Sequence, residues 1–190
     1  MSSLSKCGQL VRELPQLPLV HDETLAAPNI LKDIHQLSDE ALFGGTIENS
    51  DMARAARAGL ILAAGGWDEA HRIVQDLDTP EAQYWHAIVH RREPDSSNAK
   101  YWFRQVGHHP VMDQLVVILS GPEGPDKTVL QQLTKSEKWD PFKYVDVCMA
   151  CHSGSQKELL PILLDIQHKE FMSLLDYCTQ HGLGPSLKKT

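Results

Sequence analysis

Apolar residues recur three and four positions apart along most of the chain, which is the spacing that places them on one face of an α-helix. Turns rich in glycine, proline and serine separate these stretches and divide the chain into segments of helical length. The expected helices cover residues 30–43, 50–64, 67–78, 80–93, 98–107, 111–120, 127–135, 141–152 and 156–182. The pattern therefore predicts an all-α protein.

The ends of these segments carry residues that start helices. Ser50 is a good N-cap, and Asp140 followed by Pro141 predicts another helix start. Pro161 predicts either a kink or a late start in the last segment. No alternating strand pattern occurs, and the best strand candidate, residues 116–119, is short enough to be buried helix instead.

Two neighbouring pieces of the chain, residues 64–80 and 93–110, resemble each other. In both, a turn is followed by an alanine, by apolar residues four and seven positions later, and by a closing proline. Each piece follows another helix, which is the layout of helix-turn-helix pairs in tetratricopeptide or Sel1-like repeats. The alanines, Ala70 and Ala99, are closer together than the period of about 34 residues in tetratricopeptide repeats. We therefore expect stacked helical hairpins in a single domain rather than membership of that repeat family.

The chain of 190 residues divides into three parts. Residues 1–28 contain Pro15, Pro18 and Pro28 in a mixed polar and aliphatic setting, which predicts an irregular arm with room for one short helix. Residues 29–183 are expected to form the helical domain, and residues 184–190 a flexible tail.

Composition narrows the classes of function. No apolar run approaches the ~18 residues of a membrane-spanning helix, and the first residues lack the apolar core of a secretory signal. We therefore expect a cytoplasmic protein without a membrane partner. The 25 acidic and 18 basic residues give a net charge of -7, which repels nucleic acid unless the basic residues gather on one face. Nucleic acid is consequently not an expected partner.

The four cysteines are few and unevenly spread, which predicts reduced thiols rather than a disulfide framework. Cys148, Cys151 and His152 fit the C-x-x-C-H pattern of covalent haem attachment. That attachment requires export, for which the sequence carries no signal, and the motif lies inside an expected amphipathic helix. Covalent haem is therefore not expected, and a zinc or redox role for the two cysteines lacks a second ligand pair nearby.

The main candidate for chemistry lies in the helix expected over residues 80–93. His86, His90 and Glu93 fall in adjacent turns on the side opposite the apolar arc. Two imidazoles four positions apart can hold one divalent metal, and a carboxylate one turn further completes a facial set of three ligands. His108 and His109 are candidates for further ligands or for acid–base groups near neutral pH. The alternative is an ordinary solvated helix face, on which histidines contact water.

The same region is rich in residues suited to binding a partner. Arg91 and Arg92 lie in the last turn of the helix, where ion pairs with Glu93, Asp95 or another helix are favoured over an anion-binding role. Aromatic and arginine side chains anchor many protein interfaces. The candidates for partner or ligand binding are Trp85, Arg91, Arg92, Asp95, Tyr101, Trp102 and Arg104.

Residues 84–110, YWHAIVHRREPDSSNAKYWFRQVGHHP, and the later segment WDPFKYVDVC resemble an uncharacterised microbial protein family. That family carries a YWHAxxHRREPDxxNAxYWFRxVGxHP signature, and the resemblance covers roughly residues 53–178. The resemblance implies no activity, but it marks residues 84–110 as the characteristic segment of the family.

Two functions follow from these residues. The first is a protein- or peptide-interaction module, or a self-associating protein, with a groove around residues 84–110, because stacked hairpins form concave surfaces. The second is a metal-dependent or small-molecule enzyme with a His/Glu site on the same segment. The sequence contains no G-x-S-x-G, P-loop or G-x-G-x-x-G pattern, which excludes sites that depend on those motifs.

Overall fold

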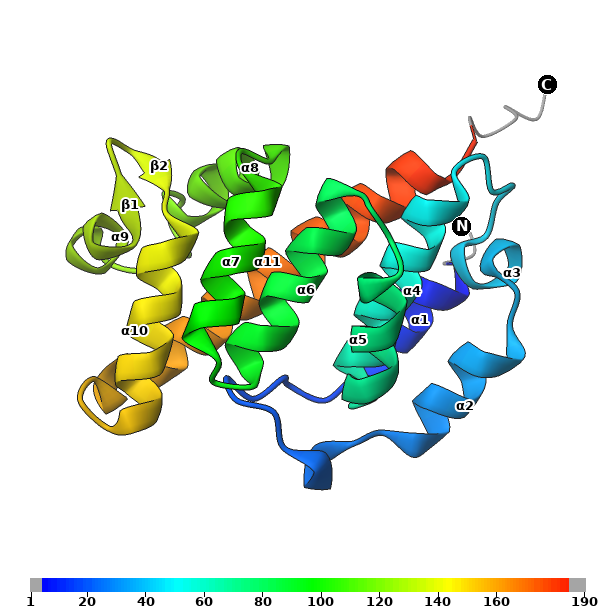
Figure 1. The fold of residues 1–190 in the computed structure, drawn as a ribbon, viewed down its shortest axis with the longest axis horizontal. Helices are drawn as coiled ribbons and strands as arrows, with labels where there is room; N and C mark the ends of the chain where they lie inside the picture. The colour runs from blue at the N-terminus through cyan, green and yellow to red at the C-terminus, as the bar shows by residue number, and fades with distance from the viewer. Residues whose placement is uncertain (1–4, 185–190) are drawn as a thin grey trace.

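A computed structural model describes residues 5–184 of the chain, and these residues form an all-α fold, as predicted (Figure 1). The described helices are α1 (Lys6–Glu13), α2 (Pro28–Gln36), α3 (Asp39–Phe43), α4 (Ser50–Ala63), α5 (Trp67–Gln75), α6 (Pro80–Arg92), α7 (Ser96–Val106), α8 (Pro110–Leu119), α9 (Lys127–Leu133), α10 (Pro141–Ser153) and α11 (Leu160–Gly182). Two 3₁₀ helices, η1 (Glu23–Leu25) and η2 (Lys157–Leu159), and a small hairpin of β1 (Thr134–Lys135) and β2 (Lys138–Trp139) complete the described elements.

Several helix starts follow the predicted capping residues. Asp140 caps α10, with Pro141 in the first turn. Helix α4 begins at Ser50 as expected, but the cap is Asn49, whose side chain accepts hydrogen bonds from the next turn. In α11, Pro161 lies in the first turn, so the late start is the correct alternative.

Two local features differ from the prediction. The helix expected over residues 30–43 is interrupted, because Leu37 adopts an extended conformation and Ser38 caps a separate helix, α3. Residues 116–119 lie in α8, whereas the β1–β2 hairpin was not predicted. Strands of two residues are too short to leave an alternating pattern, and the turn at Ser136 and Glu137 has positive φ values of 50° and 62° without a glycine.

Helices α4 to α7 form two consecutive hairpins that pack side by side (Figure 1). Ala70 and Ala99 are both buried between helices, as the hairpin pattern predicts. Gly59 of α4 lies so close to Trp85 of α6 that a Cβ atom on the glycine would be 2.6 Å from the indole. Small residues thus permit the close approach of helices within the stack.

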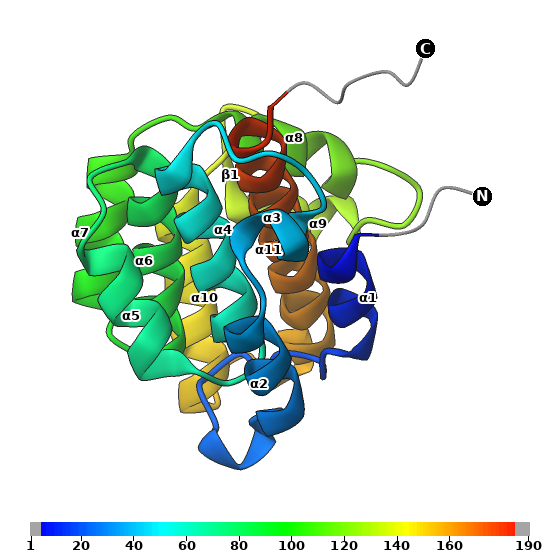
Figure 2. The same ribbon diagram turned by 90° about the vertical axis from the view of Figure 1, so that its right-hand side faces the viewer.

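The long helix α11 covers the inner face of these hairpins. It packs along α4 and α8, and Figure 2 shows it enclosed between the hairpins and α1. Phe171 of α11 lies 4.7 Å from Trp85, measured between ring centroids. Glu170 forms a fully buried ion pair of 2.6 Å with Arg91 and accepts a hydrogen bond from the Tyr84 hydroxyl. The side chains of α6 that were expected to line an open groove therefore contact a helix of the same chain.

The N-terminal arm contains one short helix, α1, and then crosses the end of α6. The backbone N–H of His21 donates to the carbonyl of Arg92 over 2.7 Å. Arg92 Nε and Gln167 Nε2 both donate to the carbonyl of Pro18, at 3.3 and 3.1 Å. These bonds hold the arm against α6 and α11.

At the other end of the domain, the N–H of Gly184 donates to the carbonyl of Thr46. The rest of the expected flexible tail, residues 185–190, lies outside the described residues. Within the described part of the chain, no helix has the length and apolar character needed to cross a membrane.

Candidate metal centre

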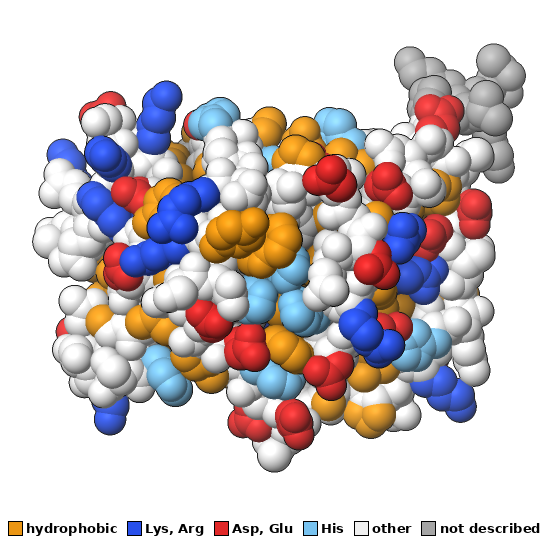
Figure 3. All heavy atoms as spheres, viewed as in Figure 1, with side chains coloured by type: hydrophobic (Ala, Val, Ile, Leu, Met, Phe, Trp, Pro, Cys, Tyr) orange, Lys and Arg blue, Asp and Glu red, His pale blue; other side chains and the backbone are white. Residues whose placement is uncertain are grey.

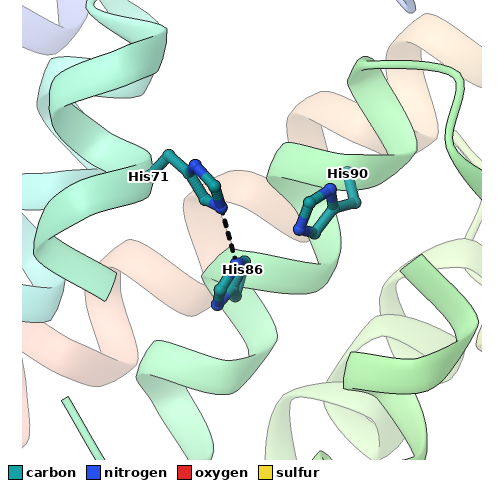
Figure 4. Close-up of side chains that lie close together, drawn as sticks. All are labelled: His71, His86 and His90. Carbon is teal, nitrogen blue, oxygen red and sulfur yellow. Dashed lines mark hydrogen bonds between the residues drawn. The ribbon is translucent and has the colours of Figure 1, made fainter. Parts of the chain in front are cut away.

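Three histidines from two helices converge on one face of the molecule (Figure 4). His86 and His90 lie one turn apart on α6, and His71 of α5 points toward them from the neighbouring helix. The Nε2 atoms of His71 and His86 are 2.8 Å apart. One ligand nitrogen from each of the three rings lies within 4.8 Å of the other two. We refer to His71, His86 and His90 as the histidine cluster.

Glu93 orients one ring of the histidine cluster. Its carboxylate Oε2 lies 3.0 Å from Nδ1 of His90, so the protonated Nδ1 donates to the carboxylate. In a neutral ring with this tautomer, the lone pair that binds a metal lies on the other nitrogen, Nε2. Histidines that ligate metals commonly donate their second ring N–H to a carboxylate in this way.

Burial keeps His71 and His86 of the histidine cluster neutral near pH 7. It lowers the pKa of His86 to about 3, and the nearby His90 and His71 add to the decrease. The pKa of His71 is lowered by burial and by His90, against the opposing effect of Glu93 and Asp68. Protons therefore compete weakly with a metal ion for these nitrogens.

Two tryptophans flank the histidine cluster. Trp102 of α7 stacks on His86 with ring centroids 3.9 Å apart, and Trp67 of α5 lies 5.3 Å from His71. Figure 3 shows histidine side chains gathered in the middle of this face, beside apolar side chains and with acidic ones nearby. The aromatic contacts restrain the rotation of the imidazole rings.

A cavity of about 560 Å³ lies between the arm, the start of α5 and the end of α6, and its lining includes neighbours of the histidine cluster but none of its three histidines. Trp67 and Glu93 line this cavity and also contact His71 and His90. A volume of this size accommodates a small organic molecule. We call it the arm cavity.

The structure places the three predicted metal ligands in two groups. His86 and His90 come together and are buried, with 2% and 8% exposure, so the alternative of a solvated helix face does not hold. Glu93 lies outside the group of three nitrogens, in a second group with His90 and Asp95, in which one ligand atom from each residue lies within 4.8 Å of the other two. Sequence reasoning missed His71, although its position one turn after Trp67 placed it near the apolar side of its helix.

His108 and His109 each have partners elsewhere. The buried His109 caps α8, since its Nδ1 accepts the N–H of Val111, and its Nε2 lies 3.3 Å from the Glu81 carboxylate. His108 is exposed and pairs with Asp113. The structure therefore gives both residues local structural contacts and does not bring either into the group of three ligand nitrogens.

The residues predicted to bind a partner fall into two groups. Trp85, Arg91 and Arg92 are at most 1% exposed, so they do not present an open surface to a macromolecular partner, whereas Arg92 lines the arm cavity. The other four lie on or next to α7. Asp95 caps this helix, and Tyr101 is 49% exposed. Trp102 stacks on His86, and the guanidinium of Arg104 lies over the ring of Phe142.

The C-x-x-C-H motif lies within α10, as expected. Cys148 is fully buried, and burial raises the pKa of its thiol to about 12. Cys151 is also buried, whereas His152 is exposed. The two sulfur atoms therefore do not project together from an open surface.

Basic side chains gather away from the histidine cluster, over α7, α10 and the β1–β2 hairpin (Figure 3). Part of this charge is neutralised locally, since Lys100 pairs with Asp146. The expectation that nucleic acid is not a partner stays a prediction.

No family model, curated protein or solved structure matches the chain. The resemblance of residues 84–110 to a microbial family stays a prediction, and the roles of individual residues rest on the geometry described above.

Proposed function

We propose that this protein binds a divalent transition-metal ion at the histidine cluster and is a metal-dependent enzyme that acts on a small molecule in the arm cavity. The observation that carries the proposal is the mutual approach of one ring nitrogen from each of His71, His86 and His90. Two nitrogens bound to one tetrahedral zinc lie about 3.3 Å apart, given Zn–N distances of about 2.0–2.1 Å. Small rotations of the rings are enough to reach that arrangement.

Hydrogen bonds among the described residues do not give every ring nitrogen of the histidine cluster a partner. His71 and His86 share one proton across their contact, and Nδ1 of His86 is buried without a hydrogen-bond partner among the described residues. A neutral His90 whose Nδ1 donates to Glu93 would offer a further lone pair on Nε2. A metal ion between the rings would use lone pairs that otherwise face one another.

The ligand set suggests the kind of ion and its chemistry. Three imidazoles without a thiolate suit zinc, cobalt, nickel or copper. Three protein ligands leave a coordination position for water, whose pKa a bound zinc lowers to about 7. The carboxylates of Glu93 and Asp68, which both act on His71 electrostatically, would partly offset the positive charge of the ion.

Metal analysis tests the binding. Protein purified without chelator or histidine tag and dialysed against limiting zinc is expected to retain one ion per chain. His71→Ala, His86→Ala and His90→Ala should each lose most of it. His35→Ala is the matched control, because His35 is an exposed histidine that pairs with Glu69. Background metal in the wild type, or equal loss in the control, contradicts the proposal.

A cobalt-substituted sample tests the enzymatic part. If one coordination position holds water, the visible spectrum of bound cobalt should change as that water ionises near neutral pH. A spectrum that does not vary between pH 6 and pH 9 would indicate a closed, structural ion and contradict the enzymatic role.

A second candidate function is binding of a protein or peptide partner, and one observation favours it. Tyr101 is a large, 49% exposed aromatic side chain that packs edge-on against Trp102. Exposed aromatic residues are frequent interface anchors. Self-association measured by sedimentation should weaken in Tyr101→Ser but not in Val117→Ser, which alters an apolar residue of α8 that is 74% exposed. A monomeric wild type would exclude the self-associating form.

A further inference from the structure

Arg92 carries a buried positive charge without a carboxylate partner. Its side chain is 1% exposed, its Nε donates to the carbonyl of Pro18, and its Nη1 has no hydrogen-bond partner within the described chain. The adjacent Arg91 forms an ion pair with the buried carboxylate of Glu170. Of the two neighbouring guanidinium groups, only one is therefore paired with an acidic side chain among residues 5–184.

The Arg92 guanidinium remains charged at neutral pH. Burial lowers its pKa to about 10, and repulsion from Arg91 contributes to the decrease. A buried, unpaired charge is costly to the folded protein. An anion that pairs with Arg92 would remove that cost, and a guanidinium matches the two oxygens of a carboxylate.

Arg92 lines the arm cavity, together with His21 and Trp67. The exposed residues of the same cavity include Glu23, Asp68 and Glu93. Arg72 is the exposed basic residue of this lining, and the acidic residues outnumber it. The cavity thus combines a buried cation with a rim that is acidic on balance. The negative charge of this rim would repel a phosphate dianion more strongly than a singly charged carboxylate. The part of the ligand that lies at the rim should therefore be neutral or basic.

We propose that the arm cavity binds a small organic carboxylate, whose oxygens accept hydrogen bonds from Arg92 and whose remainder lies along Trp67 toward the histidine cluster. The inference deepens the proposed function, because it names the class of substrate. It rests on that function only in treating the bound carboxylate as a substrate. The pairing with Arg92 itself needs no metal ion.

The experiment compares benzoate with benzamide, its uncharged analogue, on full-length protein stripped of metal with EDTA. Titration calorimetry or ligand-observed NMR should show benzoate binding at least roughly tenfold tighter than benzamide. Arg92→Met should weaken benzoate binding by roughly tenfold or more. Arg72→Met is the matched control, because Arg72 is an exposed arginine of the same cavity, and it should weaken binding by only about two- to threefold.

A second variant covers the case in which Arg92→Met fails to fold. Asp68→Asn leaves Arg92 intact and removes a rim charge, so it should tighten benzoate binding by about two- to threefold. Benzoate that binds no better than benzamide, or equal losses in Arg92→Met and Arg72→Met, would overturn the inference.

Zinc binding is measured on the same preparation before the EDTA treatment, which separates the two proposals. Zinc bound without benzoate binding would remove the inference and leave the proposed function in place. Benzoate binding without zinc would keep the carboxylate site and remove the metal centre.

Discussion

His71 and His86 contact each other through their Nε2 atoms at 2.8 Å, although they lie 15 residues apart on different helices. In such a contact one Nε2 donates its proton and the other Nε2 accepts it. Protonation of the accepting nitrogen would place two N–H groups face to face. The contact therefore makes the stability of the metal-free protein depend on pH.

The metal-free protein should lose stability as the pH falls below 6.5. The pKa of His86 is about 3 in the folded protein, against an ordinary value of 6.5, so the unfolded chain binds more protons between these values. The contribution of this histidine is present above pH 6.5 and is lost toward pH 3. Between pH 7 and pH 5 the loss is about 2 kcal/mol, measurable by urea denaturation in EDTA.

The variant His86→Phe is the control for that pH dependence. Phenylalanine preserves a ring against Trp102 but does not titrate. Its unfolding free energy should vary less between pH 7 and pH 5 than that of the wild type. An unchanged slope in the variant would assign the pH dependence to other groups.

Glu93→Gln should weaken zinc binding about 10- to 100-fold, because an outer carboxylate fixes the tautomer of a ligating histidine. Glu93 is exposed, so the melting temperature should remain close to that of the wild type. Calorimetric titration with zinc measures the effect. Glu69→Gln, which removes a carboxylate bonded to the exposed His35, should leave zinc affinity unchanged.

Glu170→Gln should destabilise the fold by about 3–5 kcal/mol, because it leaves the charge of Arg91 buried without compensation. Chemical denaturation measures the loss. The double variant Glu170→Gln with Arg91→Met removes both charges and should be more stable than Glu170→Gln alone. A double variant less stable than Glu170→Gln would mean that the ion pair contributes little to the position of α11.

Gly59→Ala should cost about 1–3 kcal/mol, since the new methyl group overlaps the ring of Trp85 at 2.6 Å. Trp85→Phe creates space at the same place. A double-mutant cycle should therefore show favourable coupling between the two substitutions. Additive effects would indicate that the helices move apart instead of clashing at this point.

Much of the local structure was predictable, because it depends on residues close together in the sequence. Helix periodicity reports which positions share a face within about four residues. Capping residues such as Asp140 act on backbone groups in the next turn. For the same reason His86 and His90, four positions apart on one helix, were correctly expected to lie together.

The surroundings of α6 were not predictable in this way. The wheel placed His86 and His90 on the polar face of the helix, and helices α5 and α7 cover that face, while α11 covers the opposite one. A helix that is enclosed on several sides can carry polar residues wherever a partner from another element receives them. Periodicity within one helix contains no information about those partners.

The sequence by itself determined the all-α class, most helix positions and the pairing of His86 with His90, since these depend on neighbouring residues. Only the tertiary structure decided that His71 completes the histidine cluster and that Glu93 orients His90. It also decided that Glu170, 79 residues away, pairs with Arg91 and that Arg92 has no acidic partner among the residues the structure describes. Those relationships arise when distant helices pack, and packing depends on the shape and burial of whole faces rather than on local spacing.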